Sequence, residues 1–295
     1  MCRLLALHCI ECRELSNAIS LTLDALVEAS SFDSRLIAVT AGRRESHGDG
    51  WGYALALNRG GAPAVAHDKF ILPIFSQFSR EVLAQVARFL GVRGEAAAIL
   101  HARAASPSEP LGSRASHPYE YRIRVGDEEE ATLYFAHNGG ANKDALRKEL
   151  KLARHYHTDS YALGLYIARA LESSQCLEER CLARAVAEAV GRFCVKDGKP
   201  LGGVTAALLV SDKGFALVAS SWFDSSDELR AQYYQPYAAL IKRGERALAV
   251  FASPTVIDRL RELGLAWRAK PIDAGEVIAI DARADSGFRR LARIG

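Results

Sequence analysis

Short apolar runs, bounded by glycine, proline or polar turn residues, recur along most of the chain. Such runs of four to nine residues are typical of strands that are buried on both faces. Two of them, 2–8 and 96–101, contain almost no polar residue before their final histidine. We expect strands at residues 2–8, 51–57, 96–101, 132–136, 204–211, 215–221, 247–252 and 277–280.

Between these runs, apolar residues recur at the three- and four-residue spacing of an amphipathic helix. The clearest case is 15–29, where Leu15, Ile19, Leu23 and Leu26 fall on one helical face. Further helices are expected at 79–90 with Ser79 as N-cap, and at 144–152, 159–171, 177–193 and 254–263. Turns or loops are expected at 58–61, at 107–118 and at His137-Asn138-Gly139-Gly140.

The order of these elements indicates an α+β protein. Strands gather towards both ends of the chain, with most helices between them, so we expect two packed sheets with helices outside. No repeat, linker or change of composition marks a boundary, and a single domain over 2–295 is therefore expected.

Composition narrows the class of protein. Apolar residues make up 49% of the chain and charged residues 25%, which supports a folded protein with a large core. The formal net charge of +3 argues against a dedicated nucleic-acid surface. Charged residues interrupt every apolar run and no secretory signal opens the chain, so we expect a cytoplasmic protein without a membrane span.

The chain has six cysteines: Cys2, Cys9, Cys12, Cys176, Cys181 and Cys194. Cys9 and Cys12 have the C-x2-C spacing, but no second pair completes a tetrahedral zinc site. We therefore expect buried thiols or a structural bridge here, with a redox pair or half of a metal site as the alternative.

Cys2 directly follows Met1. Removal of the methionine would leave a thiol and a free α-amine on one short skeleton. The amine of a chain terminus titrates near roughly 7.7–8.0 and can act as general base for its own thiol, whose usual pKa is about 8.5. The alternative is a chance cysteine at the start of a buried strand.

Four short motifs downstream of Cys2 favour the first interpretation. They are Asp49-Gly50-Trp51-Gly52, His101-Ala102-Arg103, Ala136-His137-Asn138-Gly139-Gly140 and Thr158-Asp159-Ser160, and His117-Pro118 can be added to them. Together they resemble the glutaminase domain of class II glutamine amidotransferases, which are N-terminal-nucleophile hydrolases, and most closely the stand-alone bacterial and archaeal proteins of this type. The resemblance runs from Cys2 to about Leu171 and more loosely through 203–295.

This resemblance implies a four-layer αββα sandwich and assigns roles to particular residues. Asn138 and Gly139 would donate to the oxyanion that forms during amide cleavage. Arg103 would bind the α-carboxylate of the substrate and Asp159 its α-ammonium. The alternatives are a hairpin turn at Asn138-Gly139, a structural salt bridge for Arg103 and a helix cap for Asp159.

Two further residues are placed at the substrate on the same resemblance. Ser106 lies where related proteins often have a hydroxyl residue that helps to bind the carboxylate. His47 opens the glycine-rich loop beside the nucleophile. His101, His117 and His137 fall in motifs where the family uses histidine for packing and hydrogen bonding, so no metal and no cofactor are expected.

The expected reaction is hydrolysis of the γ-amide of glutamine, or of a γ-glutamyl amide, with ammonia passed to an acceptor or to a partner chain. One alternative is a γ-glutamyl peptide hydrolase of the glutathione or ergothioneine type, with a peptidase as partner. The other is a non-catalytic subunit that binds γ-glutamyl groups.

Overall fold

The computed structural model describes residues 2–106, 109–126, 129–153, 157–266 and 268–295. Met1 and the first two residues of the expected loop at 107–118 therefore lie outside the described residues.

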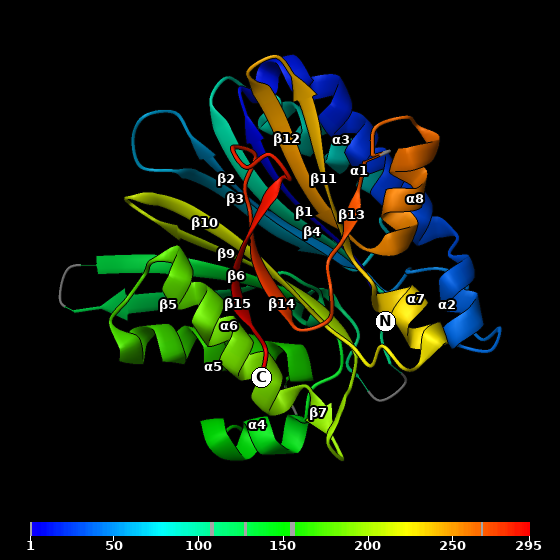
Figure 1. Ribbon diagram of the computed structural model, residues 1–295, viewed down its shortest axis with the longest axis vertical. Coiled ribbons are helices and arrows are strands. Elements are labelled where there is room, and N and C mark those ends of the chain that lie inside the picture. Colours follow the sequence, from blue (N-terminus) through cyan, green and yellow to red (C-terminus); the bar gives the residue numbers. More distant parts are fainter. Residues whose placement is uncertain (1, 107–108, 127–128, 154–156, 267) are drawn as a thin grey trace.

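Two large antiparallel sheets form the centre of the molecule (Figure 1). The first has the strand order β13-β11-β12-β1-β4-β2-β3 and the second the order β15-β14-β10-β9-β6-β5. The first sheet contains β1 (Cys2–Ile10), β2 (Trp51–Asn58), β3 (Ala64–Phe70), β4 (Glu95–Arg103), β11 (Tyr237–Arg243), β12 (Arg246–Ala252) and β13 (Lys270–Pro271). The second contains β5 (Tyr119–Val125), β6 (Glu129–Gly139), β9 (Gly203–Ser211), β10 (Gly214–Trp222), β14 (Glu276–Ile280) and β15 (Phe288–Arg293). The short strands β7 (Val195–Lys196) and β8 (Lys199–Pro200) pair with each other.

Helices cover the outer face of each sheet, which gives four layers (Figure 1). The first sheet is covered by α1 (Ser16–Ser31), α3 (Gln77–Leu90) and α8 (Pro254–Glu262), and the second by α5 (Asp159–Ser174) and α6 (Glu179–Phe193). The remaining helices are α2 (Ser34–Val39), α4 (Lys143–Leu150) and α7 (Glu228–Tyr234), with short 3₁₀ turns at Cys12–Leu15 and Ser113–Ala115. The expected α+β sandwich is confirmed.

Side-chain alternation along each strand builds three layers of core. In β1, Leu5 and Leu7 face the helices, whereas Leu4 and Ala6 face the second sheet. Both faces are buried, which explains the nearly continuous apolar run at 2–8. By the same alternation, the Cys2 side chain belongs to the layer between the two sheets.

Two local predictions are wrong. Ser79 does not cap α3: the helix begins at Gln77, Ser76 Oγ accepts from Ser79 N at 3.2 Å, and Ser79 Oγ accepts from Trp51 Nε1 at 2.8 Å. The expected sharp turn at His137–Gly140 is also absent, because β6 continues in register with β9 as far as Gly139 opposite Gly203. Strands β3, β5, β11 and β15 were not expected.

Among the described residues, Cys176 and Cys181 form a disulfide, while Cys2, Cys9, Cys12 and Cys194 are buried free thiols. Cys9 and Cys12 thus belong to the expected class of buried thiols. Within the described ranges, no helix has the length and apolarity needed to cross a membrane.

Candidate active site

Cys2 is the first residue of β1, the central strand of the first sheet, and it is also bonded to the second sheet. As the first residue of β1 it pairs with Arg103, the last residue of β4. Its backbone N–H donates to Asn138 Oδ1 at 2.7 Å, a contact between residues 136 positions apart in the chain. Because Asn138 is in β6, the two halves of the sandwich meet at the candidate nucleophile.

The environment of the Cys2 thiol favours the thiolate. The residue is only 6% exposed, and Sγ lies 4.0 Å from the Ala104 carbonyl oxygen. In the chain that carries Met1, burial raises the pKa of this thiol, but the positively charged amino group of residue 1 and His101 outweigh burial and bring the pKa to about 6. A thiol with this pKa is largely ionised, and therefore nucleophilic, at neutral pH.

Asn138 has one amide atom engaged and the other free. Its Oδ1 accepts from Cys2, whereas its Nδ2 is buried without a hydrogen-bond partner among the described residues. A buried N–H without a partner costs about 1–3 kcal/mol, so a ligand oxygen at this position would be stabilised. The next residue, Gly139, is packed closely against the backbone of Gly202. A Cβ atom at Gly139 would lie 2.2 Å from the Gly202 carbonyl oxygen, so no larger residue fits here.

Arg103 presents a buried positive charge. Its backbone N–H donates to Gly50 O at 2.9 Å, and its carbonyl accepts from Asp49 N at 2.9 Å, which fixes the glycine-rich loop against the end of β4. The side chain is 3% exposed, Nη1 has no hydrogen-bond partner, and no carboxylate pairs with it among the described residues. A guanidinium buried in this way requires an anion.

Asp159 is the first residue of α5, and Thr158 caps that helix through a hydrogen bond from Tyr161 N at 3.0 Å. The Asp159 carboxylate accepts from Ala141 N at 2.8 Å and from Ser160 N at 2.7 Å. Within the described part of the chain it has no cationic partner. The cap of this helix is therefore Thr158 and not Asp159, so the Asp159 carboxylate remains available to a cationic ligand.

Arg103 and Asp159 act on the same neighbour, Tyr119. Burial raises the pKa of the Tyr119 phenol, Arg103 opposes this rise, and Asp159 adds to it. Both charges therefore lie close enough to Tyr119 to affect its pKa, Arg103 from the end of β4 in the first sheet and Asp159 from the start of α5, the helix that covers the second sheet.

The structure does not bring His47 and Ser106 to this pair. His47 is fully buried and its Nε2 lies 2.8 Å from Asp33 Oδ2, so the ring contacts a carboxylate instead of Arg103 or Asp159. Ser106 is exposed, and its carbonyl accepts from Glu109 N at 3.0 Å. Their substrate-binding roles stay predictions.

A buried cluster behind the nucleophile was not expected. The fully buried Arg3 forms an ion pair with Asp33, and its Nη1 donates to the Cys2 carbonyl oxygen at 3.4 Å. Tyr233 donates to the same oxygen at 3.3 Å, and its ring lies 4.3 Å from the Arg3 guanidinium carbon. These contacts hold the Cys2 backbone. The signal in the sequence was an arginine inside an apolar strand.

Three buried histidines surround the site. The rings of His101 and His117 are 4.1 Å apart, and His137 Nδ1 lies 3.1 Å from Ser160 Oγ. Burial lowers the pKa of His117 well below its usual value and that of His137 to about 4, so both are neutral. No set of three or more metal-binding side chains occurs among the residues described.

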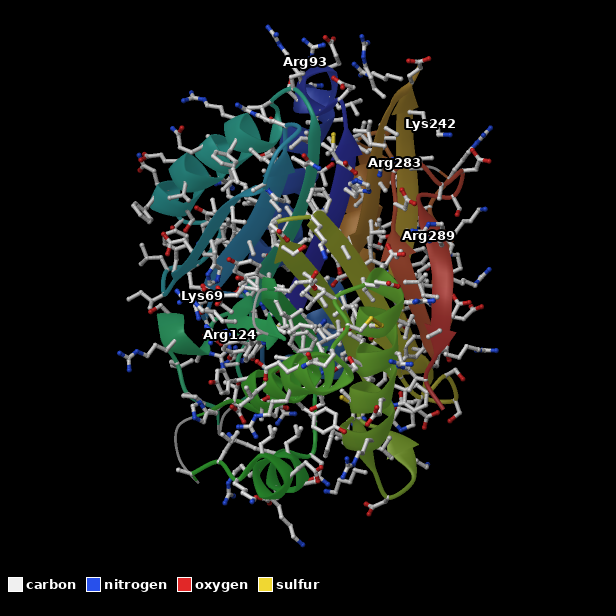
Figure 2. The ribbon with its side chains drawn as sticks, turned by 90° about the vertical axis from the view of Figure 1, so that its left-hand side faces the viewer. Lys69, Arg93, Arg124, Lys242, Arg283 and Arg289 are labelled. Carbon is white, nitrogen blue, oxygen red and sulfur yellow. A yellow bond between two sulfur atoms is a disulfide. The ribbon has the colours of Figure 1, made fainter. Side chains whose placement is uncertain are left out.

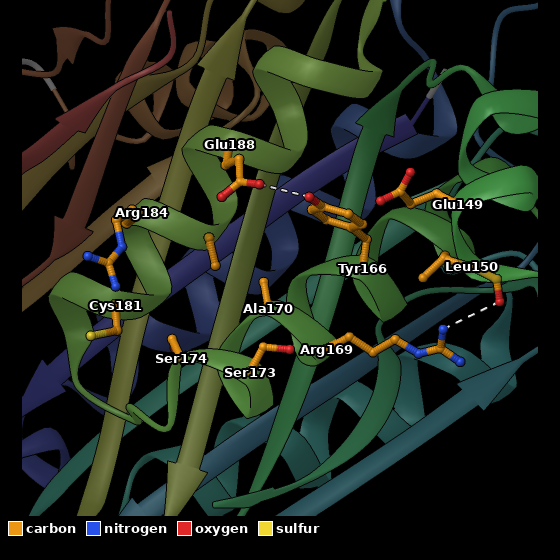
Figure 3. A pocket seen from close by; sticks show the side chains of 11 residues that line it. Glu149, Leu150, Tyr166, Arg169, Ala170, Ser173, Ser174, Cys181, Arg184 and Glu188 are labelled. Atoms are coloured by element: carbon orange, nitrogen blue, oxygen red, sulfur yellow. Dashed lines mark hydrogen bonds between the residues drawn. The ribbon is translucent and has the colours of Figure 1, made fainter.

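A groove on the outer helical layer is unrelated to this site. It runs between α5 and α6, where Tyr166 donates to Glu188 at 2.8 Å and Arg169 reaches the Leu150 carbonyl (Figure 3). None of its lining residues is a candidate site residue.

Neither the family models nor the curated proteins that were compared match this chain. Solved structures do. The allosteric regulatory enzyme of purine biosynthesis is 16% identical with a TM-score of 0.59, over 99% of this chain and 49% of that one. Glutamine phosphoribosylpyrophosphate amidotransferase from B. subtilis, complexed with ADP and GMP, is 15% identical with a TM-score of 0.52, again over 99% and 49%. The chain spans about half the length of these structures. It has the N-terminal-nucleophile hydrolase fold of class II glutamine amidotransferases.

Proposed function

We propose that the chain hydrolyses the γ-amide of glutamine, or of a γ-glutamyl amide, with Cys2 as an N-terminal nucleophile. The observation that carries this proposal is the hydrogen bond between Cys2 N and Asn138 Oδ1, which leaves Asn138 Nδ2 free beside an acidic thiol. Removal of Met1 converts the Cys2 N–H into an amine at the same position.

In the proposed reaction, the Cys2 amine takes the thiol proton and the sulfur attacks the γ-carbonyl carbon. The new C–S bond moves an electron pair onto the carbonyl oxygen, which Asn138 Nδ2 and the Gly139 N–H stabilise. Collapse breaks the C–N bond, and the ammonium returns its proton to the departing ammonia. Water then attacks the thioester with the amine as base, and the C–S bond breaks to release glutamate and the thiol.

Arg103 and Asp159 select the substrate in this proposal. The guanidinium binds the α-carboxylate through its planar fork, and the Asp159 carboxylate receives the α-ammonium. Each charge lacks a counter-ion among the described residues, so the zwitterion supplies both partners at once. Ser106 would assist at the carboxylate from the loop that follows β4.

Labelling with the diazoketone analogue of glutamine, read by intact mass, tests this proposal. We expect loss of Met1 and one covalent adduct per chain on Cys2, with ammonia released from glutamine by unlabelled protein. Cys2→Ala should retain the fold but give neither adduct nor ammonia. Cys194→Ala, which changes another buried thiol, is the matched control and should label fully. An adduct on Cys2→Ala would refute the assignment.

The leaving group and the fate of ammonia are a second part of the proposal. The chain spans about half the length of the two solved structures, and we propose that the ammonia passes to a synthase, either in another part of the same protein or in a partner chain. Steady-state rates with glutamine and with γ-glutamyl dipeptides distinguish the glutaminase from a γ-glutamyl peptide hydrolase. A dipeptide kcat/KM that exceeds that of glutamine by tenfold would favour the hydrolase.

A further inference from the structure

A second cavity lies next to the head-group residues but has a different lining. It has a volume of about 670 Å³ and opens between β3, the loop after β4, the start of β5 and the start of α5. The residues that determine its chemistry are Lys69, Arg114, Tyr119, His157, Thr158 and Tyr161.

Aromatic rings form one wall of this cavity. The His157 ring stacks on Tyr161 with centroids 4.3 Å apart and planes 15° apart, and Tyr161 meets Tyr119 edge-on at 5.5 Å. Tyr119 is held in place because its hydroxyl contacts Thr158 Oγ1 at 2.7 Å and donates to the Ala115 carbonyl at 2.9 Å. A fixed and partly exposed aromatic face of this kind favours stacking of a planar ligand.

Two cations complete the lining. The Lys69 ammonium lies 5.2 Å from the centre of the Tyr119 ring on the half-buried edge strand β3, and Figure 2 shows its place on this side of the molecule. Arg114 lies on the opposite loop. Neither forms an ion pair with a carboxylate among the described residues. Glu120 also lines the cavity; it lies 3.1 Å from His67 and acts on Lys69 electrostatically. Two cations against one carboxylate leave the described lining with an excess of positive charge beside an aromatic wall.

We propose that this cavity is a binding site, separate from the γ-glutamyl slot, for a small molecule that combines a planar aromatic ring with an anionic group. The ligand ring stacks on the face of His157 that is turned away from Tyr161, with Tyr161 supporting the histidine from behind, and the anion lies between Lys69 and Arg114. An aromatic carboxylate and a nucleoside monophosphate share this chemistry. Binding does not require the proposed amide hydrolysis.

Isothermal titration calorimetry of the full chain tests the proposal with indole-3-acetate and AMP as the two probes. Adenosine, which lacks the anion, and inorganic phosphate, which lacks the ring, are the comparison ligands. We expect at least one probe to bind with a sub-millimolar Kd and at least tenfold more tightly than adenosine or phosphate. The tighter probe identifies the source of the ligand.

Variants locate the binding. Lys69→Gln should weaken binding of the tighter probe about tenfold, and Tyr161→Leu should weaken it similarly while leaving Lys69 in place. Arg124→Gln is the matched control, because Arg124 is an exposed cation labelled beside Lys69 in Figure 2 and paired with Glu130. The Arg124→Gln variant should bind the tighter probe with the affinity of the wild type.

Several outcomes would overturn the proposal. One is that neither probe binds with a Kd below about 1 mM; another is that Lys69→Gln and Arg124→Gln bind the tighter probe with the same affinity. A third is competitive displacement of the probe by glutamine, which would make the cavity part of the head-group slot. Loss of probe binding with intact glutamine hydrolysis in Lys69→Gln, in contrast, separates this site from the proposed reaction.

Discussion

Replacing Asn138 by alanine removes one hydrogen bond and one free donor. The hydrogen bond is that between Cys2 N and Asn138 Oδ1, and the free donor is Nδ2, which we assign to the oxyanion. Loss of one oxyanion donor costs roughly 3–4 kcal/mol of transition-state stabilisation, or about 10²–10³ in kcat. Loss of a neutral hydrogen bond that orients the amine adds about 1 kcal/mol. We therefore expect kcat to fall roughly 10³-fold.

The KM for glutamine should change little in Asn138→Ala, because Arg103 and Asp159 hold the head group through contacts that the substitution leaves intact. Ammonia release measured over a range of glutamine concentrations gives both constants. Asn142→Ala is the matched control: Asn142 caps α4 by accepting from Ala145 N at 3.1 Å and does not contact Cys2. The Asn142→Ala substitution should lower the free energy of unfolding by about 1 kcal/mol and leave kcat unchanged. A kcat in Asn138→Ala within threefold of the wild type would refute the oxyanion assignment.

The remaining predictions concern charge. In the chain that retains Met1, the pKa of Cys2 is about 6, so the alkylation rate of this unprocessed chain should rise with pH and level off near pH 7; an inflection near the usual thiol pKa would contradict this. Arg103→Lys should raise the KM for glutamine at least tenfold, since a point charge replaces the fork, and an unaltered KM would make Arg103 structural. Asp33→Asn breaks the buried pair with Arg3 and should lower the free energy of unfolding by about 3–5 kcal/mol. Burial raises the pKa of Asp33 but Arg3 and His47 bring it well below its usual range, so the stabilisation is present above about pH 4 and is lost as pH falls further. Urea unfolding at several pH values should show the gap between wild type and Asp33→Asn narrowing below about pH 4; a constant gap would show that the pair is not the cause.

The sequence predicted those parts of the fold that depend on local pattern. The run at 2–8 indicated a strand buried on both faces, and β1 extends from Cys2 to Ile10 as such a strand. Strand β5 was missed although Tyr119–Val125 alternates strictly between buried and exposed positions, so the pattern was available. Strands β3 and β15 lie at sheet edges, where exposed charged residues hide the period.

The site depended on contacts that no local pattern contains. Spacing alone does not show that Asn138 reaches Cys2 across the two sheets, or that Asp33 pairs with Arg3. The motif resemblance named Asn138, Arg103 and His47, but it did not give their contacts, such as that of the His47 ring with Asp33. The cap of α3 shows the same limit on a smaller scale, since Ser76 and Ser79 are equally good candidates until the strand that carries Trp51 packs against Ser79.

The central claim is that the α-amine of Cys2 acts on its own thiol. The most direct test compares glutamine hydrolysis by two preparations, one processed to begin at Cys2 and one with a single alanine retained before Cys2. We predict ammonia release from the first and a rate at least 10²-fold lower from the second, because an amide nitrogen cannot accept the proton. Equal rates from the two preparations would contradict the claim.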